Sequence, residues 1–239
     1  MTFKSHEPDN DRDSTESEPS VLPGTITRLT EQRRSKGRVW VELDGRSGLS
    51  VTADVVASAG LAVGDYLDDQ AIARLRGADE LERATQAALA FLAYRPRSER
   101  EVRDRLRRGQ YDDDVIAAVL ERLYDWRYLD DEDFARRWVA NRTTDHPRGR
   151  RLLQQELWRK GIDRDVARDA IEDAEIDEDA AAETLAKARL AAYAGEEPAV
   201  VRRRLGAYLA RRGYGYDVVK RALDRVMDET EESIANLDD

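Results

Sequence analysis

Three stretches of the chain repeat one skeleton of apolar residues at intervals of 51 and 52 residues. Each has a Leu, then a Tyr or Ile, a Val, and a Leu or Ile, at the same spacing in every copy. The three copies read Leu106/Tyr111/Val115/Leu120, Leu157/Ile162/Val166/Ile171 and Leu209/Tyr214/Val218/Leu223. Another apolar residue lies four positions before each leading Leu: Val102, Leu153 and Leu205. Such self-similarity is typical of tandem units too small to bury their apolar faces alone, and it favours a surface for macromolecules over a catalytic centre.

Each copy has the pattern of three helices, with a proline before or within the start of the middle one. The apolar spacing predicts helices at about 80–94, 98–108 and 112–125 in the first copy, 131–143, 148–160 and 163–174 in the second, and 177–194, 198–212 and 216–228 in the third. Paired apolar residues four apart give every middle helix a single buried stripe. We therefore expect a mainly α fold of three tandem three-helix repeats.

The turns between helices carry local signals as well. Ser98 and Glu101 have the spacing of a capping box that begins a middle helix. Gly161 and Gly213 follow the middle helices of copies two and three, where a left-handed residue ends a helix, whereas copy one has Gln110. The next apolar residue, Ile162 or Tyr214, is expected to pack back on the helix it leaves. Two aspartates are placed to cap the helices that follow: Asp112 and Asp163.

The first 78 residues differ in pattern from the rest. Residues 1–20 are polar and acidic, which predicts a disordered tail. Alternating apolar residues then predict about three strands near 25–29, 39–43 and 49–53, with a turn at Asp44-Gly45. A helix beginning near 71–75 is expected to cover this sheet, because three strands are marginally stable alone. The predicted domains are an acidic tail at 1–20, a β-rich module at 21–78, repeats at 79–128, 129–175 and 176–228, and an acidic tail at 229–239.

The charges are strongly segregated although the formal net charge is −10. Residues 95–110 carry seven Arg against three acids, residues 148–160 five cations against one acid, and residues 202–212 five Arg and no acid. Residues 112–125 and 163–179 are acidic instead. Any one basic segment could be an ordinary solvated helix face, but its recurrence in all three copies indicates a binding face. The candidate binding residues are Arg103, Arg107, Arg108, Arg148, Arg150, Arg151, Arg159, Lys160, Arg202, Arg203, Arg204, Arg211 and Arg212.

The sequence offers little for chemistry. It has no Cys and two His, at 6 and 146, and it lacks the glycine-rich loops and nucleophile elbows of common enzymes. The run Asp112–Asp114 suits a helix start better than a metal site, because consecutive side chains diverge. We therefore expect no enzyme activity, cofactor or metal. No apolar run is long enough to span a membrane and no signal peptide is evident, which favours a cytoplasmic protein.

Three groups of residues resemble the RecX family, the regulators of the bacterial recombinase RecA. They are Tyr94-Arg95-Pro96-Arg97-Ser98 with Glu101-Val102, Phe134-Ala135-Arg136-Arg137-Trp138, and Arg148-Gly149 with Glu156-Leu157 and Lys160-Gly161-Ile162. The resemblance covers about 25–228. It implies an elongated, curved body that binds in the groove of the RecA filament on single-stranded DNA. It also implies that the protein limits strand exchange, ATP hydrolysis and repressor cleavage, and so acts in homologous recombination, DNA repair and the SOS response.

Two other functions fit the residues. Three-helix units with a basic helix also occur in proteins that bind DNA directly, although few aromatic residues accompany the basic rows. A structural scaffold is the third possibility, if the charge pattern has no function. The partners we expect are the RecA filament and its single-stranded DNA, with direct DNA binding as the alternative and no membrane. A monomer is the expected oligomeric state.

Overall fold

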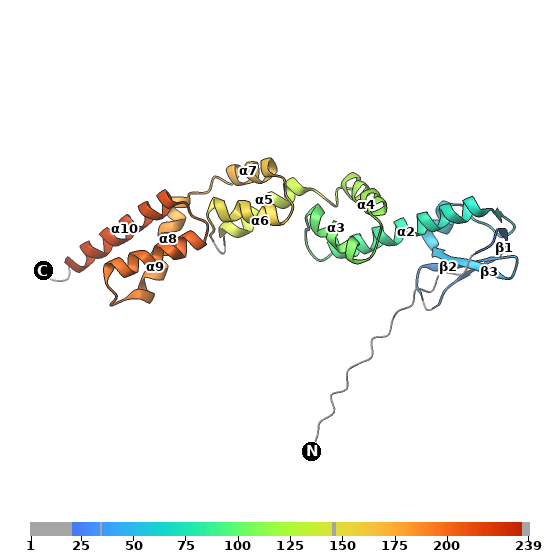
Figure 1. Cartoon of the computed structure of the whole chain (residues 1–239), viewed down its shortest axis with the longest axis horizontal. Helices are drawn as coiled ribbons and strands as arrows, with labels where there is room; N and C mark the ends of the chain where they lie inside the picture. The colour runs from blue at the N-terminus through green and yellow to red at the C-terminus, as the bar shows by residue number, and fades with distance from the viewer. Residues whose placement is uncertain (1–20, 34, 145–146, 236–239) are drawn as a thin grey trace, which may run out of the picture. The chain divides into compact units, whose positions relative to one another are not determined.

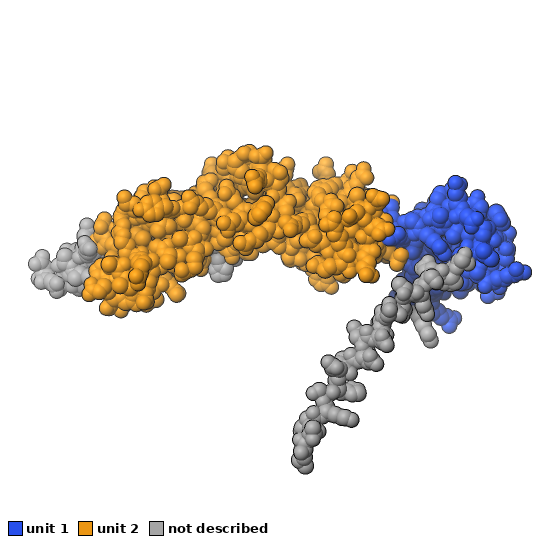
Figure 2. Space-filling model, viewed as in Figure 1, with its two compact units in different colours: residues 1–82 blue, residues 83–239 orange. Residues whose placement is uncertain are grey.

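The computed structural model describes residues 21–33, 35–144 and 147–235 (Figure 1). The chain divides into two compact units, residues 1–82 and 83–239, which Figure 2 shows in different colours. The expected tail at 1–20, both histidines and residues 236–239 lie outside the described residues.

Unit 1 contains an antiparallel sheet with strand order β3-β2-β1-β4. The strands are β1 (Gly24–Glu31), β2 (Arg38–Leu43), β3 (Ser47–Thr52) and β4 (Tyr66–Leu67). Asp44 and Gly45 have φ values of 49° and 65°, which is the left-handed geometry that a tight hairpin turn requires. The three predicted strands are confirmed. The sequence analysis missed β4 and the short helix α1 (Ala53–Ser58), because each is too short to show a period.

The core of unit 1 lies between the sheet and helix α2 (Asp69–Leu92). Val41, Leu43 and Val51 from the sheet are almost fully buried with Ile72 and Leu75 from the helix. The expected helix that covers the sheet is confirmed, but it is not a separate element. It continues without a break into the first helix of repeat 1, and only two residues of α2 precede the predicted start at Ala71.

Asp79 on α2 ties this helix to the sheet. Its carboxylate accepts a 2.6 Å hydrogen bond from the Thr52 amide at the end of β3 and pairs with the Arg38 guanidinium at 3.2 Å. The Asp79 side chain is only 6% exposed, so this pair is a structural link within unit 1.

The helices of the repeats follow the predicted order. Repeat 1 consists of α2, α3 (Glu99–Arg108) and α4 (Asp113–Asp125), repeat 2 of α5 (Asp131–Thr144), α6 (Arg150–Arg159) and α7 (Arg164–Asp173), and repeat 3 of α8 (Glu178–Leu190), α9 (Pro198–Arg211) and α10 (Tyr216–Ala235). A short 3₁₀ turn, η1 (Ala191–Tyr193), replaces the end predicted for α8. Helix α10 runs seven residues past its predicted end. The mainly α fold of three tandem three-helix repeats behind a strand-rich module is confirmed.

The apolar stripes predicted for the middle helices form the cores of the repeats. Val102 and Leu106, Leu153 and Leu157, and Leu205 and Leu209 are each at most 1% exposed. They pack with apolar residues of the flanking helices, such as Ile171 in repeat 2 and Val226 in repeat 3. The charged residues between these positions are consequently directed away from the core.

The turn signals mostly have the predicted geometry. Ser98 and Glu101 form the capping box of α3. Gly161 and Gly213 have φ values of 84° and 89°, and Ile162 and Tyr214 behind them are 2% and 3% exposed. Asp163 caps α7 through a 2.8 Å hydrogen bond from the Asp165 amide. The predicted cap at Asp112 is wrong, because its side chain makes no capping hydrogen bond although it precedes α4.

Candidate partner-binding surface

The three basic helices are connected end to end by direct contacts. At the joint between repeats 1 and 2, the Ser98 hydroxyl at the start of α3 donates a 2.6 Å hydrogen bond to the carbonyl of Lys160 at the end of α6. The Glu99 amide donates to the Asp131 carboxylate of α5 at 3.0 Å. The Lys160 ammonium also reaches back to Glu101 at 2.8 Å. The unpaired amides at one helix start are thus satisfied by the next repeat.

The joint between repeats 2 and 3 repeats this arrangement. The Gly149 amide at the start of α6 donates to the carbonyl of Arg212 after α9 at 2.9 Å. The Arg150 amide donates to the Glu178 carboxylate of α8 at 2.9 Å, as the Glu99 amide does to Asp131. In both joints the positive end of one basic helix meets the negative end of the next, which is favourable for the helix dipoles.

Two turn glycines are required by these joints as well as by the helix ends. A Cβ at Gly213 would lie 2.3 Å from the Leu152 Cβ, and one at Gly161 would lie 2.6 Å from the Arg100 Cβ. Each glycine therefore allows the start of the preceding basic helix to approach its backbone. Gln110 at the same position of repeat 1 has φ of 61°, but no repeat precedes it in the chain. This explains why a side chain is tolerated there.

Eight of the thirteen predicted binding residues contact groups of the fold. Arg103 pairs with Glu99 at 2.6 Å, Arg107 with Asp113 at 3.1 Å, Arg150 with Glu178 at 3.6 Å and Arg204 with Glu196 at 2.6 Å. Arg148 pairs with Glu156, and Arg202 with Asp224. Lys160 pairs with Glu101, and the Arg212 guanidinium lies 5.1 Å from the centre of the Tyr208 ring. These contacts hold the repeats together or neutralise nearby acids.

The other five predicted residues are exposed, and within the described parts of the chain none forms an ion pair: Arg108, Arg151, Arg159, Arg203 and Arg211. Arg151 is a direct neighbour of the paired Arg150, so adjacent residues of one basic row have different environments. An exposed cation without a carboxylate partner keeps its full charge available for a ligand.

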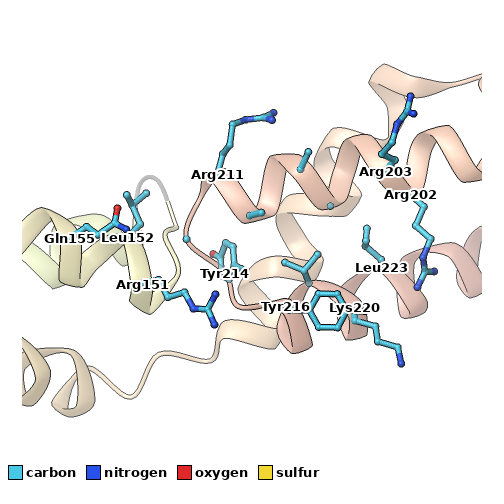
Figure 3. A pocket seen from close by; sticks show the side chains of 15 residues that line it. Arg151, Leu152, Gln155, Arg202, Arg203, Arg211, Tyr214, Tyr216, Lys220 and Leu223 are labelled. Carbon is cyan, nitrogen blue, oxygen red and sulfur yellow. The ribbon is translucent and has the colours of Figure 1, made fainter.

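Three of these free cations line a cleft of about 570 Å³ between α6, α9 and α10 (Figure 3). Its fifteen lining residues, all of them described, include five cations and no carboxylate. The cations are Arg151, Arg202, Arg203, Arg211 and Lys220. Figure 3 shows the Arg151 side chain extending from α6 toward the turn that carries Tyr214. A Cβ at Gly215 in that turn would lie 3.8 Å from the Arg151 guanidinium carbon.

Two residues of this cleft were missed by the sequence analysis. Tyr216 and Lys220 lie on α10 after the basic row, and Tyr216 is 76% exposed. An exposed ring beside several cations suits an anionic ligand that also has a planar group. The signal in the sequence that could have identified them is their spacing. Tyr216 and Lys220 are four residues apart, which places them on one face of a helix directly after a basic helix.

The carboxylates at the first joint have shifted pKa values. Burial acts to raise the pKa of Glu101, but the hydrogen bond and charge of Lys160, the hydrogen bond from the Ser98 amide and the charge of Arg95 together outweigh it, so the pKa is lowered. Burial raises the pKa of Asp131, and the charges of Glu99 and Asp130 add to the rise against the hydrogen bond from the Glu99 amide. Burial also lowers the pKa of Arg148, with help from the charges of Arg142 and Arg212. The joints therefore concentrate charge in partly buried positions.

The described residues include no group of three or more His, Asp or Glu side chains placed to hold a metal ion. None of the helices within the described ranges is long and apolar enough to span a membrane.

Family models of RecX match each repeat separately. The first three-helix domain matches residues 84–123, the second 130–171 and the third 177–223. Among curated relatives, the regulatory protein RecX of Bacillus subtilis strain 168 is 32% identical over 209 residues, which cover 87% of this chain and 79% of the relative. The regulatory protein RecX of Geobacillus thermodenitrificans is 33% identical over 214 residues, with 87% and 80% covered.

Solved structures share the fold. A crystal structure of regulatory protein RecX has a TM-score of 0.71 at 24% identity and covers 85% of this chain and all of its own. RecX from Lactobacillus salivarius has a TM-score of 0.57 at 25% identity, with 62% and 97% covered.

Proposed function

The chain belongs to the RecX family of regulatory proteins, and from this premise we propose that it binds the RecA filament on single-stranded DNA. Binding in the filament groove would inhibit the recombinase, ATPase and co-protease activities of that filament. The protein acts in the cytoplasm as a monomer and has no enzyme activity of its own.

The observation that carries the proposal is the cleft between α6, α9 and α10, which has five cations and no carboxylate among its lining residues. Arg202 pairs with Asp224 outside the lining, and the other four cations form no ion pair with a described residue. A filament on single-stranded DNA presents a regular row of phosphates, and such a ligand needs cations that acids of the same protein do not neutralise. The net charge of −10 does not oppose this, because the acids lie mainly on other helices and salt screens charges beyond about 10 Å.

We assign direct contact with the partner to the five free arginines, Arg108, Arg151, Arg159, Arg203 and Arg211, together with Tyr216 and Lys220. The paired cations of the three basic rows have an indirect role. Lys160 and Arg150 bridge the joints through Glu101 and Glu178, and the other paired cations bind groups of their own repeat.

The double variant R151E/R211E tests the proposal. Both side chains are exposed and unpaired among the described residues, so each change should alter the free energy of unfolding by no more than about 0.5 kcal/mol. Affinity for the RecA filament and inhibition of its ATPase should fall about tenfold or more at low salt, because two attractions become repulsions. The difference from the wild type should shrink as salt rises.

The matched control is R28E/R46E in unit 1. It makes the same change in net charge at two exposed arginines that form no ion pair with any described residue. It should retain wild-type inhibition. Wild-type inhibition by R151E/R211E at low salt would contradict the proposal, as would an equal loss in the control.

The cleft also supports the second candidate function, a protein that binds DNA without RecA. A titration of labelled single-stranded oligonucleotide with the purified protein separates the two. The RecA proposal requires much tighter binding to the filament than to the bare oligonucleotide, whereas equal affinities would favour a stand-alone DNA-binding protein.

A further inference from the structure

A second cleft, which we call the loop cleft, differs in chemistry from the cleft in Figure 3. It has a volume of about 660 Å³ and lies between the segment that follows α2 and the turn between α4 and α5. Leu89, Leu92 and Phe134 give it an apolar lining. Tyr94 and Tyr128 also line it and are 87% and 58% exposed.

The loop cleft has an excess of positive charge. Four arginines and two aspartates line it: Arg95, Arg97, Arg127 and Arg137, with Asp130 and Asp133. Arg137 is paired with Asp133 at 2.7 Å. Arg95 and Arg97 share the carboxylate of Glu101, at 3.1 Å and 3.8 Å, with Lys160 at 2.8 Å. One carboxylate therefore serves three cations.

Arg97 is held in place although its hydrogen bonding is incomplete. Its guanidinium lies 4.0 Å from the centre of the Phe91 ring, and its side chain is 16% exposed. The Arg97 Nε atom is buried and has no hydrogen-bond partner. A buried donor of this kind is costly unless a ligand or water completes it.

The backbone on both sides of the loop cleft is fixed. Arg127 has φ of 59° and follows the C-cap residue of α4, and the Tyr128 amide then donates a 2.8 Å hydrogen bond back to the Leu123 carbonyl. Pro96 and the Ser98 capping box fix the opposite side. The exposed rings are therefore carried on ordered segments, which lowers the entropy cost of binding.

We propose that the loop cleft binds an acidic segment of the partner protein that carries an apolar anchor residue. This inference rests on the proposed function and assigns protein contact to the loop cleft and phosphate contact to the cleft of α6, α9 and α10. Leucine and phenylalanine side chains can enclose an apolar anchor, and the arginines can bind the flanking carboxylates in a bidentate manner.

Nucleic acid fits the loop cleft less well. Its two aspartates, Asp130 and Asp133, would repel a phosphate chain. The cleft of α6, α9 and α10 differs from it, since no carboxylate is among its described lining residues. Exposed Tyr with Arg is, in addition, the composition that is enriched at protein interfaces.

The test uses the full chain with the double variant Y94A/Y128A and the control Y66A. Tyr66 on β4 is 66% exposed and lies in unit 1, so Y66A removes an exposed aromatic ring that does not line the loop cleft. Circular dichroism should show an unchanged fold for all three proteins. Two ligands are titrated separately, a RecA filament assembled on an oligonucleotide of deoxythymidine and the same oligonucleotide alone.

We expect Y94A/Y128A to bind the filament about tenfold more weakly than the wild type, as truncation of central interface aromatics does. Its affinity for the bare oligonucleotide should stay unchanged, whereas R151E/R211E should lose affinity for both. If Y94A/Y128A binds the filament as tightly as the wild type, the inference about the loop cleft is overturned, whereas the proposed function is unaffected. An equal loss on filament and oligonucleotide would assign the loop cleft to nucleic acid and overturn it too. A wild-type protein that binds the filament no better than the oligonucleotide would instead overturn the proposed function.

Discussion

At the scale of single residues, neighbours in the sequence have different roles. Arg150 is paired with Glu178, whereas Arg151 is exposed and lines the cleft of α6, α9 and α10. The acid that decides this lies 28 residues further along the chain. Composition alone could therefore identify the basic row but not separate its structural cations from its free ones.

Asp131 provides a test at this scale. Its raised pKa means that the folded state binds a proton more readily than the unfolded state, so the ionised side chain is destabilising above the folded pKa. This penalty disappears as the pH falls below the ordinary pKa of aspartate. The variant D131N removes the charge but keeps an oxygen for the Glu99 amide. We expect its melting temperature at pH 7 to equal or exceed that of the wild type, with the difference vanishing in acid.

The control for this prediction is D131A, which leaves the Glu99 amide without its acceptor. It should unfold more easily than D131N at every pH. A melting temperature for D131N as low as that of D131A at pH 7 would show that the carboxylate charge stabilises the joint.

At the scale of helices, the contacts at the joints explain why a glycine occupies position 213, which the geometry of a helix end explains only in part. Gly213 has a positive φ, and it must also lack a Cβ so that the start of α6 can pack against its backbone. Gly195 has a similar positive φ, 84° against 89° at Gly213, but nothing lies within 4 Å of a Cβ placed there. Chemical denaturation of G195A should show only the cost of strained backbone, about 1–2 kcal/mol. G213A should cost about 1–3 kcal/mol more, because the added methyl displaces Leu152. Equal losses of stability in G195A and G213A would mean that the joint rearranges around the added methyl group without a measurable cost.

The helices themselves were largely predictable, since their apolar spacing and end signals are local. Gly161, Gly213 and the Ser98 capping box marked their ends correctly. The continuous α2 was not predictable in the same way, because its first part packs in the core of unit 1 while its last part belongs to repeat 1. The loop cleft was missed because Tyr94, Tyr128 and Phe134 come from three segments that only tertiary packing brings together.

At the scale of the whole molecule, a repeat array should lose stability locally, since each repeat contacts mainly its neighbours. Leu209 is fully buried in repeat 3, and L209A should cost about 2–5 kcal/mol there. Hydrogen exchange should then accelerate strongly in α8–α10, less in α5–α7, and not at all in the sheet of unit 1. Uniform acceleration across the chain would show that the protein unfolds as a single cooperative unit.

The end-to-end joints also determine the valency of the protein. Each joint fixes a basic helix through one hydrogen bond to the carbonyl that follows the next basic helix and one from a helix-start amide to a carboxylate of the next repeat. In the proposed function, a partner with regularly spaced sites therefore meets several linked basic helices. Once one helix has bound, the next reaches its site at an effective concentration in the millimolar range, far above that of free protein in solution. Contacts that are individually weak then combine to give avidity. The proposed function then implies discrimination between two forms of the partner, because an isolated subunit would engage one basic helix only, while an assembled polymer would engage several.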